Sequence, residues 1–187
     1  MILPRQFYAR PTIEVARNLL GTVLTHGECS GIIVETEAYL GNGDLAAHSA
    51  AGLTHRTRVI FGPPGHAYVY LSYGIHECFN IVAEPDGQPG CVLIRALAPV
   101  TGLDIMRTRR PAGTPDHRLA AGPGNLTRAL NITRQLYGHD LTQPPFSVST
   151  GPELRSTEIE VTPRIGITKS ADLPLRFVLH KRPEVSR

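Results

Sequence analysis

Two glutamates stand two residues apart in the segment VETEAY at 34–39. They fall in the run GIIVETEAYL at 31–40, whose composition predicts a β-strand. Alternate residues of a strand share a face, so Ile33, Glu35, Glu37 and Tyr39 are expected to point the same way, with neighbours roughly 6.5–7 Å apart. Carboxylates so placed could perform general acid–base catalysis. An acidic face on a solvent-exposed edge strand would have no chemical role, and both interpretations remain open at this point.

An arginine inside an apolar strand is the second chemical signal. Arg95 lies in CVLIRAL at 91–97, where a buried guanidinium is costly unless a carboxylate pairs with it. Glu35 or Glu37 on an adjoining strand would serve as that partner. The pair could belong to a reactive site, or it could be a buried salt bridge that only fixes strand register.

Aromatic and amide side chains supply the third signal. Tyr68 and Tyr70 share a strand face, and Tyr73 follows in a turn before the next strand, which predicts a hairpin with an aromatic tip. Such a tip is either an ordinary turn tyrosine or a wedge that can enter a base stack. Asn80 lies among apolar neighbours and needs a hydrogen-bond partner from protein, water or ligand. His48 follows the acidic strand after a Gly-rich loop.

The elements that must position these residues are mostly short strands. Further strands are expected at 22–26, 66–72, 75–83, 158–161, 164–167 and 175–180, and helices at 13–20, 102–110 and 125–136. In the first helix, Ile13, Ala16 and Leu19 are expected to share a face, with Thr12 as the cap. Strands that follow one another without regular helices predict an α+β fold. We expect a single domain over 1–187, with a curved, largely antiparallel sheet, a few flanking helices and a protruding β-hairpin.

Composition narrows the function classes. Hydrophobic residues make up 41% of 187, which suffices for a packed core, and three cysteines of irregular spacing predict a reduced protein. No signal peptide or apolar run of about 20 residues is present, so a cytoplasmic protein without membrane contact is expected, nucleoid-associated in a bacterium. All basic residues but Lys169 and Lys181 are Arg, which permits a polyanionic partner. No metal-binding, dinucleotide-binding or P-loop motif occurs, so neither a metal nor a cofactor is expected.

An ordered set of motifs resembles the alkyladenine (3-methyladenine or N-methylpurine) DNA glycosylase family. The set comprises VETEAYLG at 34–41, AAHS at 46–49, PG at 64–65, YVYLSYG at 68–74, Asn80 and CVLIRAL at 91–97. The resemblance runs from about residue 4 to residue 183. It implies a base-excision repair enzyme that binds double-stranded DNA from the minor groove, flips out an alkylated or deaminated purine and hydrolyses its N-glycosidic bond. A monomer suits this task. Because the only lysines, Lys169 and Lys181, lie far along the chain, no lyase activity is expected.

The resemblance also implies roles for single residues. Glu37, rather than Glu35, would be the water-activating base, and Arg95 would help to hold the water. The remaining implied residues are Tyr39, His48, Tyr70 and Asn80 around the flipped base, Tyr73 in the gap left in the duplex, and Thr54 and Arg56 on the DNA backbone.

Two other functions remain open on the sequence. A non-catalytic nucleic-acid-binding module on the same fold would use Glu37 and Arg95 as a structural pair. A carbohydrate hydrolase would use Glu35 and Glu37 together, although such sites usually present indole platforms and this chain has no tryptophan. The chain also departs from the family at Ala98, where many members carry an acid, and in the loop GNGD at 41–44.

Overall fold

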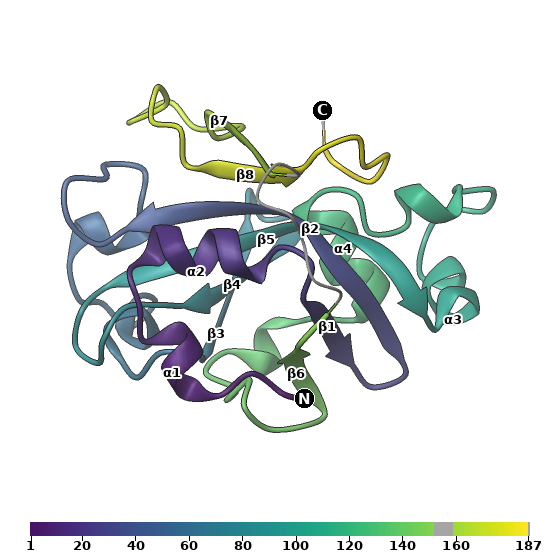
Figure 1. Cartoon of the computed structure of the whole chain (residues 1–187), viewed down its shortest axis with the longest axis horizontal. Coiled ribbons are helices and arrows are strands. Elements are labelled where there is room, and N and C mark those ends of the chain that lie inside the picture. The colour runs from purple at the N-terminus through teal and green to yellow at the C-terminus, as the bar shows by residue number, and fades with distance from the viewer. Residues whose placement is uncertain (152–158, 187) are drawn as a thin grey trace.

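One curled antiparallel sheet organises the chain, for which the computed structural model describes residues 1–151 and 159–186 (Figure 1). Its strands, in spatial order, are β3 (Ala67–Ser72), β4 (His76–Val82), β5 (Gly90–Thr101), β2 (Cys29–Leu40), β1 (Val23–His26) and β6 (Phe146–Ser149). Two more strands, β7 (Ile159–Thr162) and β8 (Arg176–Leu179), pair with each other, and β8 also pairs with β2. The predicted α+β fold with a curved antiparallel sheet is confirmed.

Strand β2 lies at the centre of this sheet. Strand β5 pairs along one edge of it, while the other edge is shared between β1, at residues 29–32, and β8, at residues 35–37. The acidic segment therefore has a strand on both sides. Glu35 and Glu37 do not lie on a solvent-exposed edge, and both side chains are fully buried.

The ladder between β2 and β5 is irregular beside the glutamates. Val34 on β2 and Arg95 on β5 have no partner residue in the described register. Such β-bulges change the direction of side chains and are common next to functional sites. One consequence is that the alternation predicted for β2 fails, because Ile33 packs in the hydrophobic core rather than beside the glutamates.

Short helices flank the sheet. They are α1 (Arg5–Tyr8), α2 (Thr12–Leu19), α3 (Leu103–Thr108) and α4 (Pro123–Leu130), with 3-10 turns η1 (His48–Ala51), η2 (Arg58–Phe61), η3 (Asp116–Arg118) and η4 (Arg134–Leu136). The helix predicted at 125–136 begins earlier and ends at Leu130, because Asn131 adopts a φ of 55° that terminates it. The helix predicted at 102–110 is present over a shorter range, as α3.

Helix α2 confirms the predicted helix but corrects its details. Val15, Ala16 and Leu19 are buried, whereas Ile13 is 40% exposed. Thr12 is the first helical residue rather than the cap, and its hydroxyl donates to Glu84 Oε1 at 2.7 Å. The buried face therefore follows the spacing i, i+1, i+4, which places it against the sheet.

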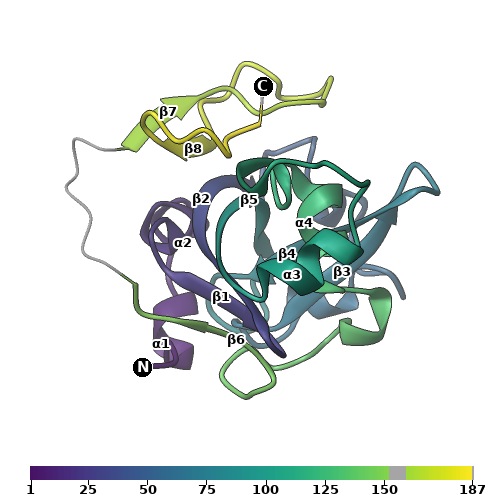
Figure 2. The ribbon, with the colours of Figure 1, turned by 90° about the vertical axis from the view of Figure 1, so that its right-hand side faces the viewer.

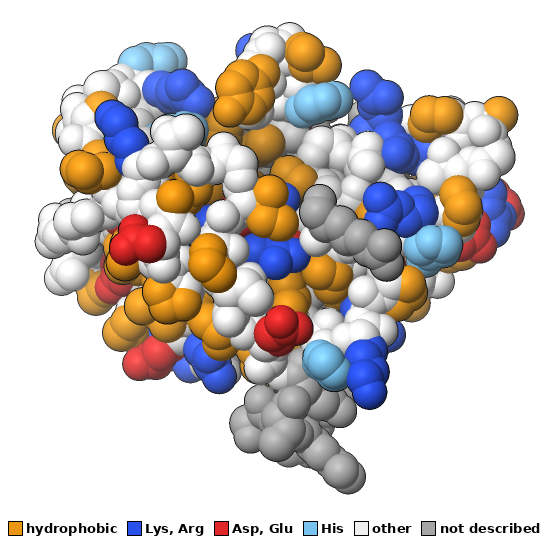
Figure 3. Space-filling view, turned by 90° about the horizontal axis from the view of Figure 1, so that it is seen from above, with side chains coloured by type: hydrophobic (Ala, Val, Ile, Leu, Met, Phe, Trp, Pro, Cys, Tyr) orange, Lys and Arg blue, Asp and Glu red, His pale blue; other side chains and the backbone are white. Residues whose placement is uncertain are grey.

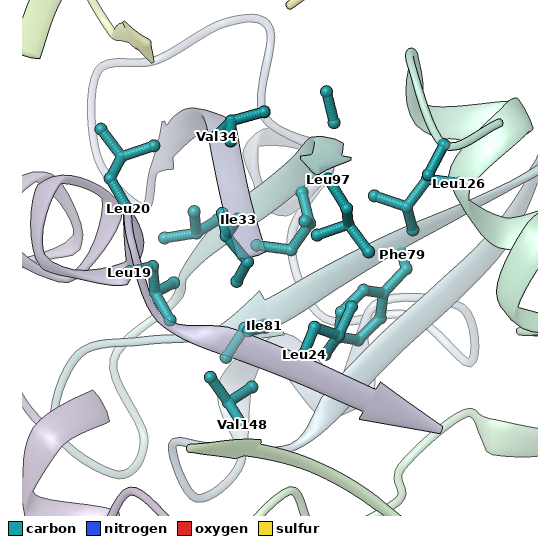
Figure 4. Packing of buried hydrophobic residues seen from close by; sticks show 14 of the residues in the cluster. Leu19, Leu20, Leu24, Ile33, Val34, Phe79, Ile81, Leu97, Leu126 and Val148 are labelled. Carbon is teal, nitrogen blue, oxygen red and sulfur yellow. The ribbon is translucent and has the colours of Figure 1, made fainter. Parts of the chain in front are cut away.

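The main hydrophobic core lies between the sheet and these helices (Figure 4). Leu19 from α2, Ile33 from β2, Phe79 from β4 and Leu126 from α4 meet there, and all four are fully buried. A smaller cluster forms around Ile60, Tyr68, Val82 and Cys91, with Tyr39 and Tyr70 packed against it. This second cluster supports the strands that carry the candidate site.

The predicted hairpin is confirmed, and it projects from the body of the molecule (Figure 2). Tyr73 and Gly74 have φ values of 49° and 70°, and the Ile75 N–H donates to the Ser72 carbonyl at 3.0 Å. Two positive φ angles define a type I′ turn, which suits the twist of a hairpin. At Tyr73 this conformation costs roughly 1–2 kcal/mol, because the residue has a Cβ. The turn holds the Tyr73 ring outward, with 90% of the residue exposed.

The segment between β7 and β8 corrects one prediction. Residues 164–167 form bends rather than a strand, with a φ of 74° at Gly166 and a buried Arg164. The strands predicted at 158–161 and 175–180 are present as β7 and β8, and Glu158 lies outside the described residues. Among the residues described, no helix has the length and apolar character needed to cross a membrane.

Candidate active site

A cavity of about 520 Å³ opens between the hairpin, β5 and the segment that follows β7. Its volume lies within the range of roughly 300–1,000 Å³ that is usual for small-molecule sites. Seven of the nine predicted site residues line it: Tyr39, His48, Arg56, Tyr70, Tyr73, Asn80 and Arg95. Thr54 is exposed and lies outside the cavity, just before the turn at 55–57. Glu37 lies behind the cavity wall, in contact with Tyr39 and Ile165.

Glu37 is fully buried and is held by residues that themselves face the cavity. Its Oε1 accepts the backbone N–H of Ile165 at 2.8 Å and lies 3.3 Å from Arg95 Nη1. Its Oε2 accepts the Tyr39 hydroxyl at 2.9 Å. A carboxylate oxygen has two lone pairs, so Oε2 keeps one acceptor position that no described residue fills.

Glu35 differs from Glu37 because donors occupy both of its oxygens. Oε1 accepts Arg95 Nε at 2.9 Å and Arg176 Nε at 2.7 Å, while Oε2 accepts both the N–H and the hydroxyl of Ser186. Burial acts to raise the pKa of Glu35, but the Ser186 hydrogen bonds and the two arginines outweigh it and leave that pKa lowered. Glu35 is therefore a fully hydrogen-bonded anion with no free acceptor position for chemistry.

Arg95 bridges the two carboxylates, whereas the sequence led us to expect either Glu35 or Glu37 as its partner. The bulge at Arg95 sets its guanidinium opposite the gap between Glu35 and Glu37, so that Nε reaches one and Nη1 the other. Burial acts to lower the pKa of Arg95, but the two glutamates raise it on balance, and the guanidinium stays charged. Two carboxylates, Arg95 and Arg176 thus form a buried cluster whose formal charges cancel.

Aromatic side chains form the wall that faces this cluster. The rings of Tyr68 and Tyr70, two residues apart on β3, lie 5.3 Å from centroid to centroid. His48 meets Tyr70 edge-on at 4.6 Å, and its Nδ1 lies 2.9 Å from the Tyr68 hydroxyl. Burial, and then the charge of Arg56, lowers the pKa of His48 to about 4. The imidazole is neutral at pH 7, with one nitrogen as donor and the other as acceptor.

Three tyrosines of the cavity, Tyr39, Tyr68 and Tyr70, keep their hydroxyl protons at neutral pH. Burial raises the pKa of Tyr39 and of Tyr70, and it raises the pKa of Tyr68 to about 12. Asn80 is buried at the cavity floor, where its Nδ2 donates to the Tyr68 carbonyl at 3.2 Å and its Oδ1 lies 3.9 Å from Cys91 Sγ. The orientation of the Asn80 amide is thereby fixed before any ligand arrives.

Arg56 and Tyr73 lie at the cavity mouth. The Arg56 guanidinium carbon is 5.0 Å from the centroid of the Tyr70 ring, a cation–π arrangement. Tyr73 belongs to both the exposed hairpin tip and the cavity wall. Of the described residues that line the cavity, none is a lysine.

Three contributors to the site were missed in the sequence. Tyr68 anchors His48, and its position two residues before Tyr70 on the same strand was the signal available. Ile165 acts through its backbone N–H, so its side-chain type gives no indication that it binds Glu37. Ser186 binds Glu35 although the two residues are 151 positions apart in the sequence, and no local sequence pattern predicts such a contact.

Comparisons with known proteins identify the family of this chain. The family model described as Methylpurine-DNA glycosylase (MPG) matches residues 6–183. A protein of Methanoculleus marisnigri named "Putative 3-methyladenine DNA glycosylase" is 53% identical over the full length of both chains. Proteins of the same name from Rhodopseudomonas palustris and Koribacter versatilis are 51% and 49% identical, over 95% and 98% of this chain and 84% and 92% of their own. The chain therefore belongs to the methylpurine-DNA glycosylase family.

Proposed function

We propose that this protein is a DNA glycosylase that releases alkylated purines, with 3-methyladenine as the reference lesion, from double-stranded DNA. The observation that carries the proposal is the carboxylate of Glu37. It is buried, charge-compensated by Arg95, and held by Tyr39, Ile165 and Arg95, all of which line an aromatic cavity. Family membership and the names of the relatives support the same assignment.

In the proposed reaction a flipped purine occupies the cavity. Tyr39, His48 and Tyr70 contact its faces, and stacking on an aromatic ring recovers about 1–3 kcal/mol of the unstacking cost. Asn80 meets the edge of the base with a fixed amide, which screens its exocyclic groups. A neutral His48 supports the binding of a cationic alkylpurine, because an imidazolium in the same place would repel it.

Glu37 acts as the general base for water. In the free protein the Tyr39 hydroxyl lies on Oε2, and a water molecule takes the remaining acceptor position there once a base has entered. Glu37 accepts a proton from this water while the water oxygen bonds to C1′ of the sugar. The C1′–N bond breaks, and its electron pair returns to the purine and neutralises the positive charge of a base alkylated at N3 or N7. One carboxylate suffices because such a base leaves without an acid.

The hairpin and the basic side chains hold the duplex. Tyr73 fills the space that the flipped nucleotide vacates, from the minor-groove side, as apolar wedges do. Thr54 and Arg56 contact the DNA backbone. The net charge of +3, and the Lys and Arg side chains distributed over the face in Figure 3, support a phosphate-binding surface. We propose a monomeric enzyme without lyase activity, since a Schiff base requires an amine at the reacting carbon.

The test is an incubation with duplex DNA methylated by dimethyl sulfate, followed by chromatography of the free bases. The parent protein should release 3-methyladenine, and Glu37→Gln should lower the single-turnover rate by about 10²–10⁴-fold while still binding the DNA. Glu14→Gln, which changes an exposed carboxylate on α2, is the matched control and should retain full activity.

Two outcomes would contradict the proposal. If Glu37→Gln released bases at the parental rate, Glu37 would not be the base. If the parent bound DNA in a salt-sensitive manner but released no base, the protein would be a binding module in which Glu37 and Arg95 are a structural pair. The buried cluster of Glu35, Arg95 and Arg176 is the observation that favours the binding module as a second candidate.

A further inference from the structure

A completely buried ion pair lies beside the proposed active site but has no place in the reaction described above. Arg164 and Asp44 are both inaccessible to solvent, and the guanidinium is bidentate, with Nη1 2.6 Å from Asp44 Oδ2 and Nη2 2.8 Å from Asp44 Oδ1. Neither side chain lines the cavity. Burial acts to raise the pKa of Asp44, but the hydrogen bonds from Arg164 and from the backbone outweigh it and leave that pKa lowered, so the pair is ionised.

This ion pair joins two segments that are 120 residues apart in sequence. Asp44 belongs to the loop after β2, and its carboxylate also accepts the backbone N–H groups of Leu40 and Ala46 at 3.0 and 3.1 Å. Arg164 belongs to the bends between β7 and β8, and it also donates to the carbonyls of Ala38 and Ser170 at 3.0 and 3.2 Å. Asp44 therefore fixes the backbone of its own segment, and Arg164 fixes backbone groups on both sides of the ion pair.

Both segments carry groups that hold Glu37. The residue after Arg164 is Ile165, whose N–H is the 2.8 Å donor to Glu37 Oε1. The Arg164 guanidinium carbon lies 4.6 Å from the centroid of the Tyr39 ring, and the hydroxyl of Tyr39 is the donor to Glu37 Oε2. One buried guanidinium is thus in contact with, or adjacent in sequence to, both neutral donors of the proposed base.

We propose that Asp44 and Arg164 are positioning residues, which act through Tyr39 and the Ile165 N–H to hold the Glu37 carboxylate in its reactive orientation. The inference rests on the proposed function, because it gives a role in the same reaction to residues that never touch the substrate. The pair also joins the wall that carries Ala46 and His48 to the wall formed by residues 165–167. The cavity is therefore formed in the free protein rather than on substrate binding.

Energetics favour a geometric role over a purely stabilising one. A buried ion pair can often be replaced by apolar side chains of similar volume without loss of stability, since desolvation offsets much of the attraction. The Nε of Arg164 is buried without a partner among the described residues, which adds to the desolvation cost. Apolar side chains could fill the space, but they could not fix two backbones through a planar fork of donors.

This difference allows stability and positioning to be separated by experiment. The variants are Arg164→Met, which leaves Asp44 unpaired, the double variant Asp44→Leu/Arg164→Met, which removes both charges, and Arg164→Lys, which keeps the charge without the fork. The matched control is Arg107→Met/Asp116→Leu, which removes a bidentate ion pair at the surface. Arg107 Nη2 and Nε lie 2.7 and 3.0 Å from the Asp116 carboxylate oxygens, both side chains are about half exposed, and neither lines the cavity. Thermal unfolding, single-turnover base release and amide hydrogen exchange are measured for each.

Arg164→Met should lose both thermal stability and activity. The double variant should regain a midpoint within a few degrees of the parent, yet remain slower in single turnover by about 100-fold, the cost of an ångström-scale displacement of a reacting group. Arg164→Lys should fall between the parent and the double variant, and the surface control should match the parent. Exchange of the Ile165 N–H should become faster in the double variant and in Arg164→Lys.

The result that would overturn the inference is recovery of both stability and rate, within twofold, by the double variant, which would make the pair purely structural. Unchanged protection of the Ile165 N–H in the variants would overturn it as well. The exchange measurement needs no activity. If the parent released no base, the proposed function would fail, while the exchange data would still decide whether the pair holds the Ile165 N–H on Glu37.

Discussion

Substituting Glu35 by glutamine tests whether Glu35 has a structural role while the neighbouring Glu37 has the catalytic one. Glu35 accepts four hydrogen bonds, two of them from arginines, and is fully buried. In Glu35→Gln the amide oxygen can still face Arg95 and Arg176, but without charge. The amide nitrogen then faces Ser186. The Ser186 hydroxyl can turn to accept one of its hydrogens, but the Ser186 N–H loses its acceptor.

The size of the effect follows from these contacts. Removing one partner of a buried charge cluster costs roughly 3–5 kcal/mol. For a chain of this length each kcal/mol lowers the unfolding midpoint by about 2–4 °C, so Glu35→Gln should lower it by about 6–20 °C. Glu37→Gln should cost less, about 1–3 kcal/mol. Its amide can accept the Ile165 N–H and donate to the Tyr39 oxygen, and Arg95, which loses the Glu37 charge, keeps its hydrogen bond to Glu35.

Catalysis should show the reverse order. Measured below its unfolding midpoint, Glu35→Gln should keep the single-turnover rate of base release within about tenfold of the parent, whereas Glu37→Gln should lose about 10²–10⁴-fold. Thermal unfolding by circular dichroism and chromatographic base release give the two quantities for each variant, with Glu14→Gln as the surface control. A Glu35→Gln variant that melts like the parent but is as inactive as Glu37→Gln would refute the assignment of a structural role to Glu35.

Three further predictions follow from single residues. Tyr73→Ala should leave the unfolding midpoint unchanged, because the ring is 90% exposed, but slow excision from duplex DNA by about 5- to 150-fold, the equivalent of 1–3 kcal/mol of stacking; equal rates on duplex DNA would remove the wedge role. His48 should titrate near pH 4 by NMR, and since the unfolded chain binds its proton near 6.5, the free energy of unfolding should fall as the pH drops from about 6.5 to 4. This slope should be smaller in His48→Gln, and an unchanged slope would contradict it. Gly65→Ala should lower stability in denaturant by about 2–5 kcal/mol, because its φ is +80° and the new Cβ would lie 2.7 Å from Cδ2 of the buried Tyr8; Gly27→Ala, with a φ of +58° and open space around it, should lose only about 1–2 kcal/mol.

Local sequence patterns predicted much of the sheet. The hairpin with Tyr73 at its tip followed from two strand-like runs around a Tyr-Gly pair, and the structure confirms it. The pairing of Arg95 with the glutamates followed from the cost of burying a lone charge, and it also holds. Both predictions succeeded because they rest on constraints that act within one strand or between a charge and its counter-charge.

Where prediction failed, distant contacts decided the conformation. Residues 164–167 were predicted to form a strand, but the Arg164 side chain is buried in its ion pair with Asp44 and the chain bends there. The predicted face of β2 was wrong at Ile33, because a bulge is a property of two paired strands and not of one. The contacts that distinguish Glu35 from Glu37 come from Ser186 and Ile165, and neither residue type suggests such a role.

The contact between Ser186 and Glu35 has a consequence for biosynthesis. Ser186 is translated 151 residues after Glu35, and the other late partner of that carboxylate, Arg176, is translated 141 residues after it. A nascent chain therefore carries the acidic strand and Arg95 while Arg176, the second counter-charge of Glu35, is still unmade, and long-range pairing of this kind closes slowly. The buried charge cluster is accordingly expected to close only after residues 176–186 have been translated.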